Sequence, residues 1–378
     1  MSMIYFNNAA TSYPKAPGVA GAVCAALETY PGAANRGGIE DFDVLAEVRM
    51  HLAKLAGIDQ PDRIGLGPNA TWGLNIAIHG ISLAAGQSVL TTAAEHNSVL
   101  RPLHALSVHK GVKLHCLSTD GCGRVRLEDW KQALEQLRPS LCVVTHASNV
   151  TGVINDIATL TELAHQYGSL VLVDLAQSLG CTEVRLSDWD VDLAAFTGHK
   201  YLLGPQGTGG LYVRPGLELD PHLTGGTGIH SDLDTMPPNM PLRIEAGTPN
   251  EPGSYGLLEA LRWQQANPWP AESIQKLLQQ LREELRRIGA AVIIPIKPCT
   301  PVVSFTVDGF SPAYIGETLL DSYDIITRNG LHCAPRIFEC LGVDPKQGTV
   351  RVSLSRFSTK EEVEELVEAM QEIIEAGL

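Results

Sequence analysis

The sequence lacks the patterns that would tie it to a membrane, a metal ion or a nucleic acid. Its 378 residues contain no apolar run long enough to span a bilayer, and no basic segment precedes an apolar one at the N-terminus. The eight cysteines include no CxxC pair and no metal-ligand spacing, in a chain too long to be a disulfide scaffold. With 28 Lys and Arg against 42 Asp and Glu, the net charge is −14 and no basic run would bind nucleic acid. We therefore expect a cytosolic protein that binds no metal, membrane or nucleic acid.

What remains is the pattern of a globular α/β protein. Hydrophobic residues make up 44% and charged residues 19% of the chain, which is long enough for a large domain with a smaller partner. Between about residues 60 and 215, short apolar segments alternate with amphipathic ones, which is typical of a mostly parallel sheet covered on both faces. The predicted strands are 88–92, 113–117, 141–146, 170–174, 193–197 and 209–213, with helices at 98–109, 128–137 and 160–166.

The remainder of the chain follows a different pattern. Residues 216–252 are rich in Gly, Pro, Thr and Asp and predict a long loop that is functional or lies at an interface. After it we expect helices at 253–265, 271–288, 312–321 and 360–376, the last with a capping box of Thr359 and Glu362, and strands at 292–295, 302–307, 325–328 and 349–354. These elements predict a large domain over 15–252 and a smaller α+β domain over 253–378. The N-terminal arm, 1–14, is expected to belong to the smaller domain.

Polar residues follow several predicted strands, and ligands of such sheets bind at the carboxyl ends of strands. Lys200 comes just after the strand 193–197, and partial burial suits a lysine to imine formation because it lowers the pKa. Asp174 ends the strand 170–174, where a carboxylate can keep a pyridinium nitrogen protonated. Taken alone, each residue more often has no catalytic role. A lysine in the position of Lys200 is usually a solvated loop residue, and an aspartate in the position of Asp174 is usually a helix cap.

In order and spacing, these residues resemble the cysteine desulfurase and selenocysteine lyase branch of the class V aminotransferase superfamily. The resemblance covers nearly the whole chain, from Asn7-Asn-Ala-Ala-Thr11 to Val350-Arg-Val-Ser353. It implies a fold-type I transferase that depends on pyridoxal 5′-phosphate (PLP), with a mostly parallel seven-stranded sheet between helices and a smaller C-terminal domain. It also implies a homodimer with active sites at the interface, because Glu245–Asn250 resembles the segment that reaches the neighbouring subunit's phosphate.

The resemblance assigns roles to individual residues. Lys200 would hold PLP as a Schiff base and move the substrate's α-proton, Asp174 would pair with the ring nitrogen, and Gln177 with the phenolic oxygen. His96 would stack on the ring and assist proton transfer. The other cofactor contacts are expected from Ala70, Thr71, Asn149, Thr197, His199 and Thr248. The substrate contacts are expected from Asn8, Ala10, Asn149, Arg328 and Arg351, of which Arg351 would clamp the α-carboxylate.

A second stretch bears on sulfur chemistry. Arg328-Asn-Gly-Leu-His332-Cys333-Ala resembles the motif of the group II (SufS-like) desulfurases. The reaction needs a thiolate to attack the substrate sulfur, and thiolate character rises near cations such as Arg328 or a protonated His332. The resemblance therefore implies conversion of L-cysteine to L-alanine, with a persulfide on Cys333 for a protein acceptor, and L-selenocysteine as another possible substrate.

Several departures from the family pattern indicate a divergent branch. They are Asn97 in place of a second histidine after His96, Trp72 in place of Glu, Asn35-Arg36-Gly without the family's His, Gly225-Gly-Thr-Gly, and the 18 positions from Cys333 to Arg351. Two alternatives stay open. One is another class V reaction, by a transaminase, kynureninase-like lyase or epimerase, in which Cys333 is incidental. The other is a non-catalytic protein that keeps the fold.

Overall fold

The computed structural model describes residues 3–29, 42–293, 295 and 298–377. The helices are α1 (Val19–Glu28), α2 (Val44–Ala56), α3 (Ala70–Gly80), α4 (Asn97–Lys110), α5 (Leu127–Leu137), α6 (Ile157–Gln166), α7 (Glu251–Ala266), α8 (Ala271–Arg287), α9 (Pro312–Tyr323), α10 (Ile337–Leu341) and α11 (Lys360–Gly377). The strands are β1 (Ile4–Tyr5), β2 (Ile64–Gly67), β3 (Ser88–Thr92), β4 (Lys113–Leu117), β5 (Leu141–Thr145), β6 (Leu170–Asp174), β7 (Leu193–Thr197), β8 (Gly209–Val213), β9 (Ala291–Ile293), β10 (Val302–Thr306), β11 (Ile325–Ile326), β12 (Arg328–Gly330) and β13 (Thr349–Ser353). None of the helices within these ranges combines the length and hydropathy that a bilayer crossing requires.

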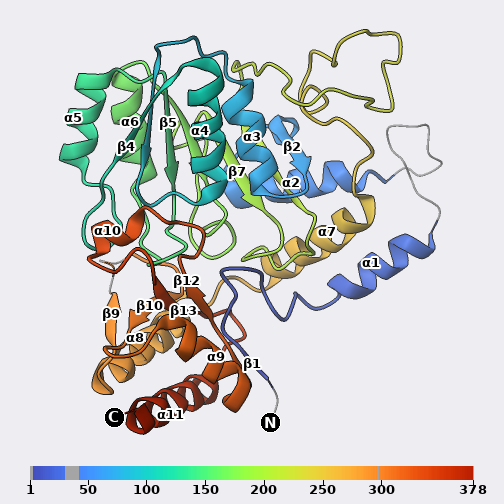
Figure 1. Ribbon diagram of the computed structural model, residues 1–378. Helices are drawn as coiled ribbons and strands as arrows, with labels where there is room; N and C mark the ends of the chain where they lie inside the picture. Colours follow the sequence, from blue (N-terminus) through green and yellow to red (C-terminus); the bar gives the residue numbers. More distant parts are fainter. Residues whose placement is uncertain (1–2, 30–41, 294, 296–297, 378) are drawn as a thin grey trace.

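A seven-stranded sheet forms the centre of the larger part of the molecule (Figure 1). Its strand order is β2-β8-β7-β6-β5-β3-β4, and β3 to β7 run parallel while β8 is antiparallel to both of its neighbours. This confirms the predicted mostly parallel sheet and its six predicted strands. The seventh strand, β2, escapes the sequence pattern because its residues Ile-Gly-Leu-Gly include two glycines, which are poor strand formers.

Helices cover both faces of this sheet. Residues of α2, α5, α6 and α7 pack on one face, and residues of α3 and α4 pack on the other. The fully apolar strands β5, β7 and β8 are buried along their whole length, as expected for strands between two layers of helices. The predicted loop 216–252 is also confirmed, since no helix or strand occurs between Val213 and Glu251.

A second, antiparallel sheet of order β12-β13-β10-β9 packs with α8, α9 and α11 around a separate core. The predicted strand 325–328 is in fact two short strands. β11 pairs in parallel with β1 of the N-terminal arm, whereas β12 belongs to the small sheet. The predicted capping box is present, because Thr359 and Glu362 exchange side-chain-to-backbone hydrogen bonds of 2.9 and 3.2 Å.

The position of α7 bears on where the two domains divide. Leu257, Leu258 and Leu261 of this helix lie in the core of the large sheet, although they follow the predicted boundary at residue 252. The apolar residues of α8 lie instead in the core of the small sheet. We propose that the domain boundary falls between α7 and α8, with the arm attached to the small domain through β1.

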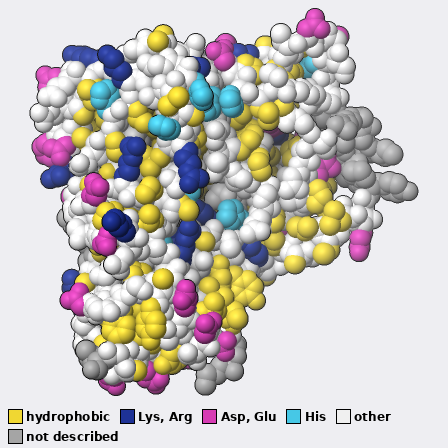
Figure 2. Space-filling view, viewed as in Figure 1, with side chains coloured by type: hydrophobic (Ala, Val, Ile, Leu, Met, Phe, Trp, Pro, Cys, Tyr) yellow, Lys and Arg dark blue, Asp and Glu magenta, His cyan; other side chains and the backbone are white. Residues whose placement is uncertain are grey.

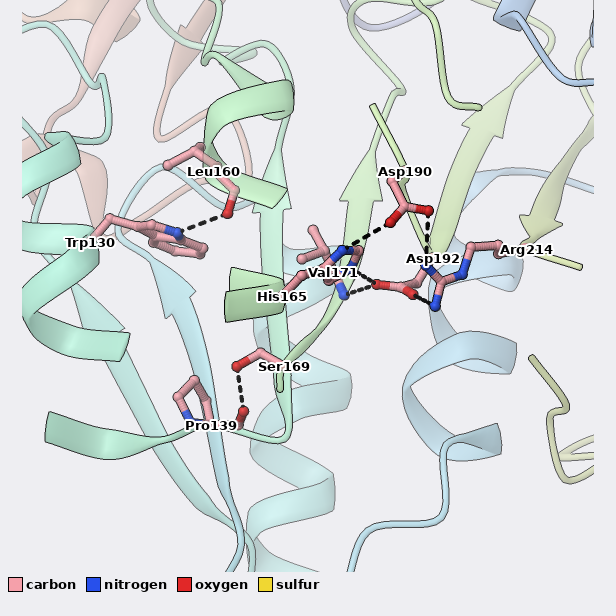
Figure 3. Close-up of polar contacts among 9 residues, drawn as sticks. All are labelled: Trp130, Pro139, Leu160, His165, Ser169, Val171, Asp190, Asp192 and Arg214. Carbon is pink, nitrogen blue, oxygen red and sulfur yellow. Dashed lines mark hydrogen bonds and ion pairs between the residues drawn. The ribbon is translucent and has the colours of Figure 1, made fainter. Parts of the chain in front are cut away.

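The amino ends of the central strands are joined by a buried ionic network (Figure 3). Asp192 is fully buried just before β7, and its carboxylate accepts hydrogen bonds from the Val171 amide (2.7 Å) and His165 Nε2 (2.8 Å). Arg214, just after β8, pairs with the same carboxylate at 2.8 Å and with the exposed Asp190 at 2.9 Å. Asp192 therefore ties β6, β7 and β8 together at the end of the sheet opposite the strand exits.

Replacing the buried carboxylate should cost far more stability than replacing the exposed one. We expect Asp192→Asn to lower the free energy of unfolding by about 3 kcal/mol, because it removes the buried negative charge that pairs with Arg214. Asp190→Asn, with its side chain 65% exposed, should cost below about 1 kcal/mol. Urea unfolding followed by circular dichroism measures both, and equal losses in the two variants would contradict this account of the network.

Candidate active site

A cavity of about 270 Å³ opens at the carboxyl ends of the central parallel strands. Parallel strands bring their carboxyl ends to one edge, so residues far apart in the sequence meet there. The cavity wall contains most of the residues singled out from the sequence: Ala10, Ala70, Thr71, His96, Asn149, Asp174, Gln177, Thr197, His199, Lys200 and Arg328.

Lys200 and Asp174 carry the opposite charges of this cavity. Burial lowers the pKa of Lys200 to about 8; Arg351 and Arg328 act in the same direction, and Asp174 opposes them. A lysine with this pKa has a larger neutral fraction at neutral pH, and the neutral amine is the form that attacks a carbonyl. Burial raises the pKa of Asp174, although the Ala176 amide donates to its carboxylate at 2.8 Å. A cationic N–H group in the cavity would stabilise the Asp174 carboxylate further.

The N-terminal arm holds the turn that precedes Lys200. The carbonyl oxygen of His199 accepts hydrogen bonds from the Ser12 amide and from Lys15 Nζ, both at 2.9 Å. The hydroxyl of Thr11 donates to the same carbonyl at 3.2 Å. The arm therefore fixes the backbone just before Lys200, and it also pairs with β11 of the small domain through β1.

Glu95 is a second buried carboxyl group at this edge of the sheet. Its Oε1 accepts hydrogen bonds from the Thr92 hydroxyl (2.7 Å) and the Thr145 amide (3.0 Å). Burial raises the pKa of Glu95 to about 8, and the nearby Asp174 adds to the increase. The two hydrogen bonds lower this pKa but do not offset the effect of burial. Glu95 is therefore mainly protonated at neutral pH, so it braces β3 against β5 without adding a second negative charge beside Asp174.

His96 forms the N-cap of α4 and lines the cavity. Its Nδ1 accepts the Ser98 amide at 3.0 Å and lies 2.7 Å from the Ser98 hydroxyl. Burial lowers the pKa of His96 to about 3, and Lys200 contributes to the decrease. The ring is therefore neutral, and because Nδ1 is an acceptor its proton resides on Nε2.

Several buried polar atoms of the cavity wall have no partner among the described residues. They are Gln177 Oε1, Thr197 Oγ1 and His199 Nδ1. Buried polar groups are rarely left unpaired, so these atoms indicate a polar ligand. Ala70 and Thr71 also present the free amides of the first turn of α3, a favourable place for a phosphate. The amine, the carboxylate, these atoms and the helix terminus together fit PLP.

Cys333 enters the site from the segment that joins β12 to α10. His332 and Cys333 both have left-handed backbone conformations, with φ of 49° and 59°, which are costly for residues other than glycine. Hydrogen bonds hold this conformation, since Asn149 Nδ2 donates to the His332 carbonyl at 2.6 Å and the Asn97 amide to the Cys333 carbonyl at 2.7 Å. Arg328 Nη2 donates to Cys333 Sγ at 3.0 Å.

Only one of the two cations expected beside Cys333 is present. His332 is buried, and its Nε2 lies 2.8 Å from the Thr349 hydroxyl. Burial lowers the pKa of His332 well below its usual value, with Arg351 and Arg328 adding to the effect, so the ring is neutral. Arg328 is therefore the cation beside Cys333, and His332 packs the turn.

Arg351 lies directly opposite Arg328 in the register of β13 and β12. It is fully buried, donating to the Asn149 carbonyl at 2.9 Å and to Asn7 Oδ1 at 3.1 Å. Its Nε has no partner, and neither arginine forms an ion pair within the described ranges. Burial lowers the pKa of Arg351, as does Arg328. Two adjacent guanidinium groups without a counterion make this side of the site suited to a substrate carboxylate.

Four residues expected at the site do not line this cavity: Cys333 and Arg351, which adjoin it through Arg328, and Asn8 and Thr248. Asn8 is buried, and its Nδ2 donates to the Ser353 carbonyl at 2.9 Å, so it fastens the arm to β13. Thr248 is exposed and lines a second cavity, of about 300 Å³, together with Trp72. The Asn35-Arg36 departure lies outside the described residues.

The sequence reasoning also missed residues that orient the site. Asn7 holds Arg351, and Ser98 fixes the tautomer of His96. Both occur in the quoted motifs, Asn7-Asn-Ala-Ala-Thr11 and Glu95-His96-Asn-Ser, but only their contacts show these roles. Glu95 had no signal beyond its place after a strand.

A model of the class-V aminotransferase family matches residues 4–366, so the chain belongs to that family. Among curated relatives, a probable cysteine desulfurase of Pyrococcus abyssi is 30% identical over 397 residues, covering 99% of this chain and 95% of that protein. A cysteine desulfurase of Escherichia coli O157:H7 is 32% identical over 313 residues, covering 80% of this chain and 76% of that protein.

Solved structures of cysteine desulfurases have the same fold as this chain. The apo structure of a cysteine desulfurase from Thermococcus onnurineus NA1 has a TM-score of 0.89 and 30% identity, covering 99% of this chain and 95% of that one. A cysteine desulfurase of Escherichia coli in its S-sulfonic acid form has a TM-score of 0.87 and 26% identity at the same coverage. The fold-type I architecture expected from the sequence is thereby confirmed.

Replacing the buried carboxyl groups of Glu95 and Asp174 by their amides should have different effects. Glu95→Gln mimics the protonated acid, so we expect it to keep PLP absorbance, whereas Asp174→Asn should lose most of it. In the folded protein the pKa of Glu95 is about 8, above the ordinary glutamate value of 4.5, so its contribution to stability is complete at low pH and is lost as pH rises towards 8. The difference in unfolding temperature between wild type and Glu95→Gln should therefore shift against wild type from pH 5 to pH 8. A pH-independent difference would show that Glu95 is ionised throughout.

Proposed function

We propose that this protein is a PLP-dependent cysteine desulfurase that converts L-cysteine to L-alanine and carries the sulfur as a persulfide on Cys333. The observation that carries the proposal is the convergence of two sets of groups on one site. Lys200 and Asp174 lie at the strand ends of the large sheet, whereas Arg328 and Arg351 lie on the small sheet and Cys333 on the segment after β12. The family and the cysteine desulfurases among its relatives support this reading.

Bound PLP supplies an electron sink for bonds to the substrate's α-carbon. The protein supplies the anchor and the charges around it. Lys200 would be the amine that holds the cofactor, Asp174 would pair with its ring nitrogen, and His96 would contact its ring. Thr197, His199 and the first turn of α3, with Ala70 and Thr71, would bind the phosphate, and Gln177 would contact the phenolic oxygen.

The remaining groups act on the substrate. Arg351 binds the α-carboxylate, with Asn149 and Ala10 beside it, and Lys200 moves the α-proton. The Cys333 thiolate attacks the substrate sulfur, so that the new S–S bond forms as the C–S bond breaks. Arg328 stabilises the thiolate before the attack and again when the persulfide is discharged. L-Selenocysteine fits the same contacts, so we include it as a second substrate.

We further propose that the enzyme works as a homodimer with shared active sites. Thr248 is exposed and lies away from the cavity of its own chain, which agrees with a contact to the phosphate of a second copy. The cytosolic location stays a prediction of the sequence.

Removing the thiol should separate sulfur transfer from cofactor chemistry. We expect Cys333→Ala to keep wild-type PLP absorbance and to lose at least about 100-fold in kcat for alanine formation from L-cysteine, since the nucleophile acts only in the chemical step. Alanine release measured by chromatography, with a thiol reductant present, provides the number.

The matched control is Cys340→Ala, which removes the partly exposed thiol of the adjoining helix α10. It should keep wild-type kcat. Full alanine formation by Cys333→Ala would refute the persulfide role, and conversion of other amino acids without loss of sulfur would favour another class V reaction.

A further inference from the structure

One face of this acidic protein is basic. From Asn97 to Thr119 the chain contains Arg101, Lys110 and Lys113 but no Asp or Glu, although the whole chain has 42 acidic residues. This stretch forms α4, β4 and the turn between them. The three cationic side chains are exposed, and none forms an ion pair with a described carboxylate.

The segment that carries Cys333 lies against this stretch. The Asn97 amide at the start of α4 bonds to the Cys333 carbonyl, and Ala94 just before α4 packs on Ala334 and Ile337. The side chain of Arg336, three residues after Cys333, is exposed and close enough to Cys116 of β4 to lower the pKa of that thiol, which burial raises. We call the exposed cations Arg101, Lys110, Lys113 and Arg336 the basic face.

The acidic residues gather elsewhere. α11, at the far end of the small domain, carries seven Glu and one Lys. Figure 2 shows Lys and Arg side chains down the middle of the face over α4, whereas Asp and Glu lie mainly towards its edges and below. Between Arg328 and Val343 the only acidic residue in the sequence is Glu339. On this face the positive charge thus lies near the partly exposed Cys333, whereas α11 is strongly acidic.

We propose that the basic face is the docking surface for an acidic protein that takes sulfur from Cys333. This inference rests on the proposed function. The acceptor's thiolate attacks the outer sulfur of the persulfide, a new S–S bond forms on the acceptor, and the old S–S bond breaks. The electron pair returns to Cys333 as a thiolate beside Arg328, so the transfer needs no further oxidant or reductant.

Charge complementarity is the physical reason for choosing an acidic partner. A patch of one sign steers an oppositely charged partner and raises its association rate, and salt screens the effect over about 10 Å at 0.1 M. A basic acceptor would meet Arg101, Arg336 and the two site arginines and would be repelled. The basic face around Cys333 therefore selects protein partners by their charge before the two contact surfaces come together.

The test uses two synthetic cysteine peptides, one flanked by glutamates and one by lysines, each activated as a disulfide with thionitrobenzoate. Mixed-disulfide formation at Cys333 is followed by mass spectrometry of the digested holoenzyme, which requires no desulfurase activity. The acidic peptide should react about 10-fold faster at low ionic strength, and high salt should remove the preference. The reduced peptides are then offered to the enzyme with L-cysteine, and persulfide transfer should show the same order.

Two double variants with equal changes of charge locate the surface. Arg101→Glu with Arg336→Glu should abolish the preference for the acidic peptide. Lys276→Glu with Lys360→Glu, on α8 and α11, should retain it. Alanine formation with a small-molecule reductant should stay at the wild-type level in both.

Equal preference in both double variants, or a preference that salt does not weaken, would overturn the docking surface. Binding of an RNA or DNA oligonucleotide to this face without a preference for the acidic peptide would overturn it too. If L-cysteine yields no persulfide while the disulfide exchange keeps its preference, the proposed function fails and the basic face stands.

Discussion

The site depends on an amine and a carboxylate held out of water at the ends of neighbouring strands. Burial pushes the pKa of Lys200 down and that of Asp174 up, so each group resists its charged form, and each stabilises the other's charge. A ligand with a carbonyl for the amine and a cationic ring nitrogen for the carboxylate satisfies both. The surroundings conform to this requirement, since Glu95 beside Asp174 is protonated and His96 beside Lys200 is neutral.

The two domains meet at Asn149. Its side chain donates to the His332 carbonyl, and its own carbonyl accepts from Arg351. One loop after β5 therefore fixes both the turn that carries Cys333 and the position of the Arg351 guanidinium. This contact explains how Cys333 on the small domain is held against the cavity of the large one, as the proposed sulfur transfer requires.

Charge works at two scales around Cys333. Within the site, Arg328 and Arg351 favour a carboxylate and a thiolate. Outside it, the basic face extends the same sign over α4 and α10, in a molecule whose net charge is −14. Net charge alone does not reveal this face, because composition does not show where charges lie once the chain is folded.

The sequence by itself determined six of the seven strands of the sheet, four of the helices that cover it, and most of the residues that line the cavity at the strand exits. Apolar strands such as β5 and β7 are recognisable because burial on both faces requires uninterrupted hydrophobic residues, and Lys200, Asp174 and Cys333 stand in recognisable motifs. Only the tertiary structure decided the protonation of Glu95 and His332, the bond from Asn7 to Arg351, the division of 325–328 into two strands, and the membership of α7 in the large core. Each of these depends on which groups become neighbours and how far water is excluded, and neither quantity is contained in local spacing.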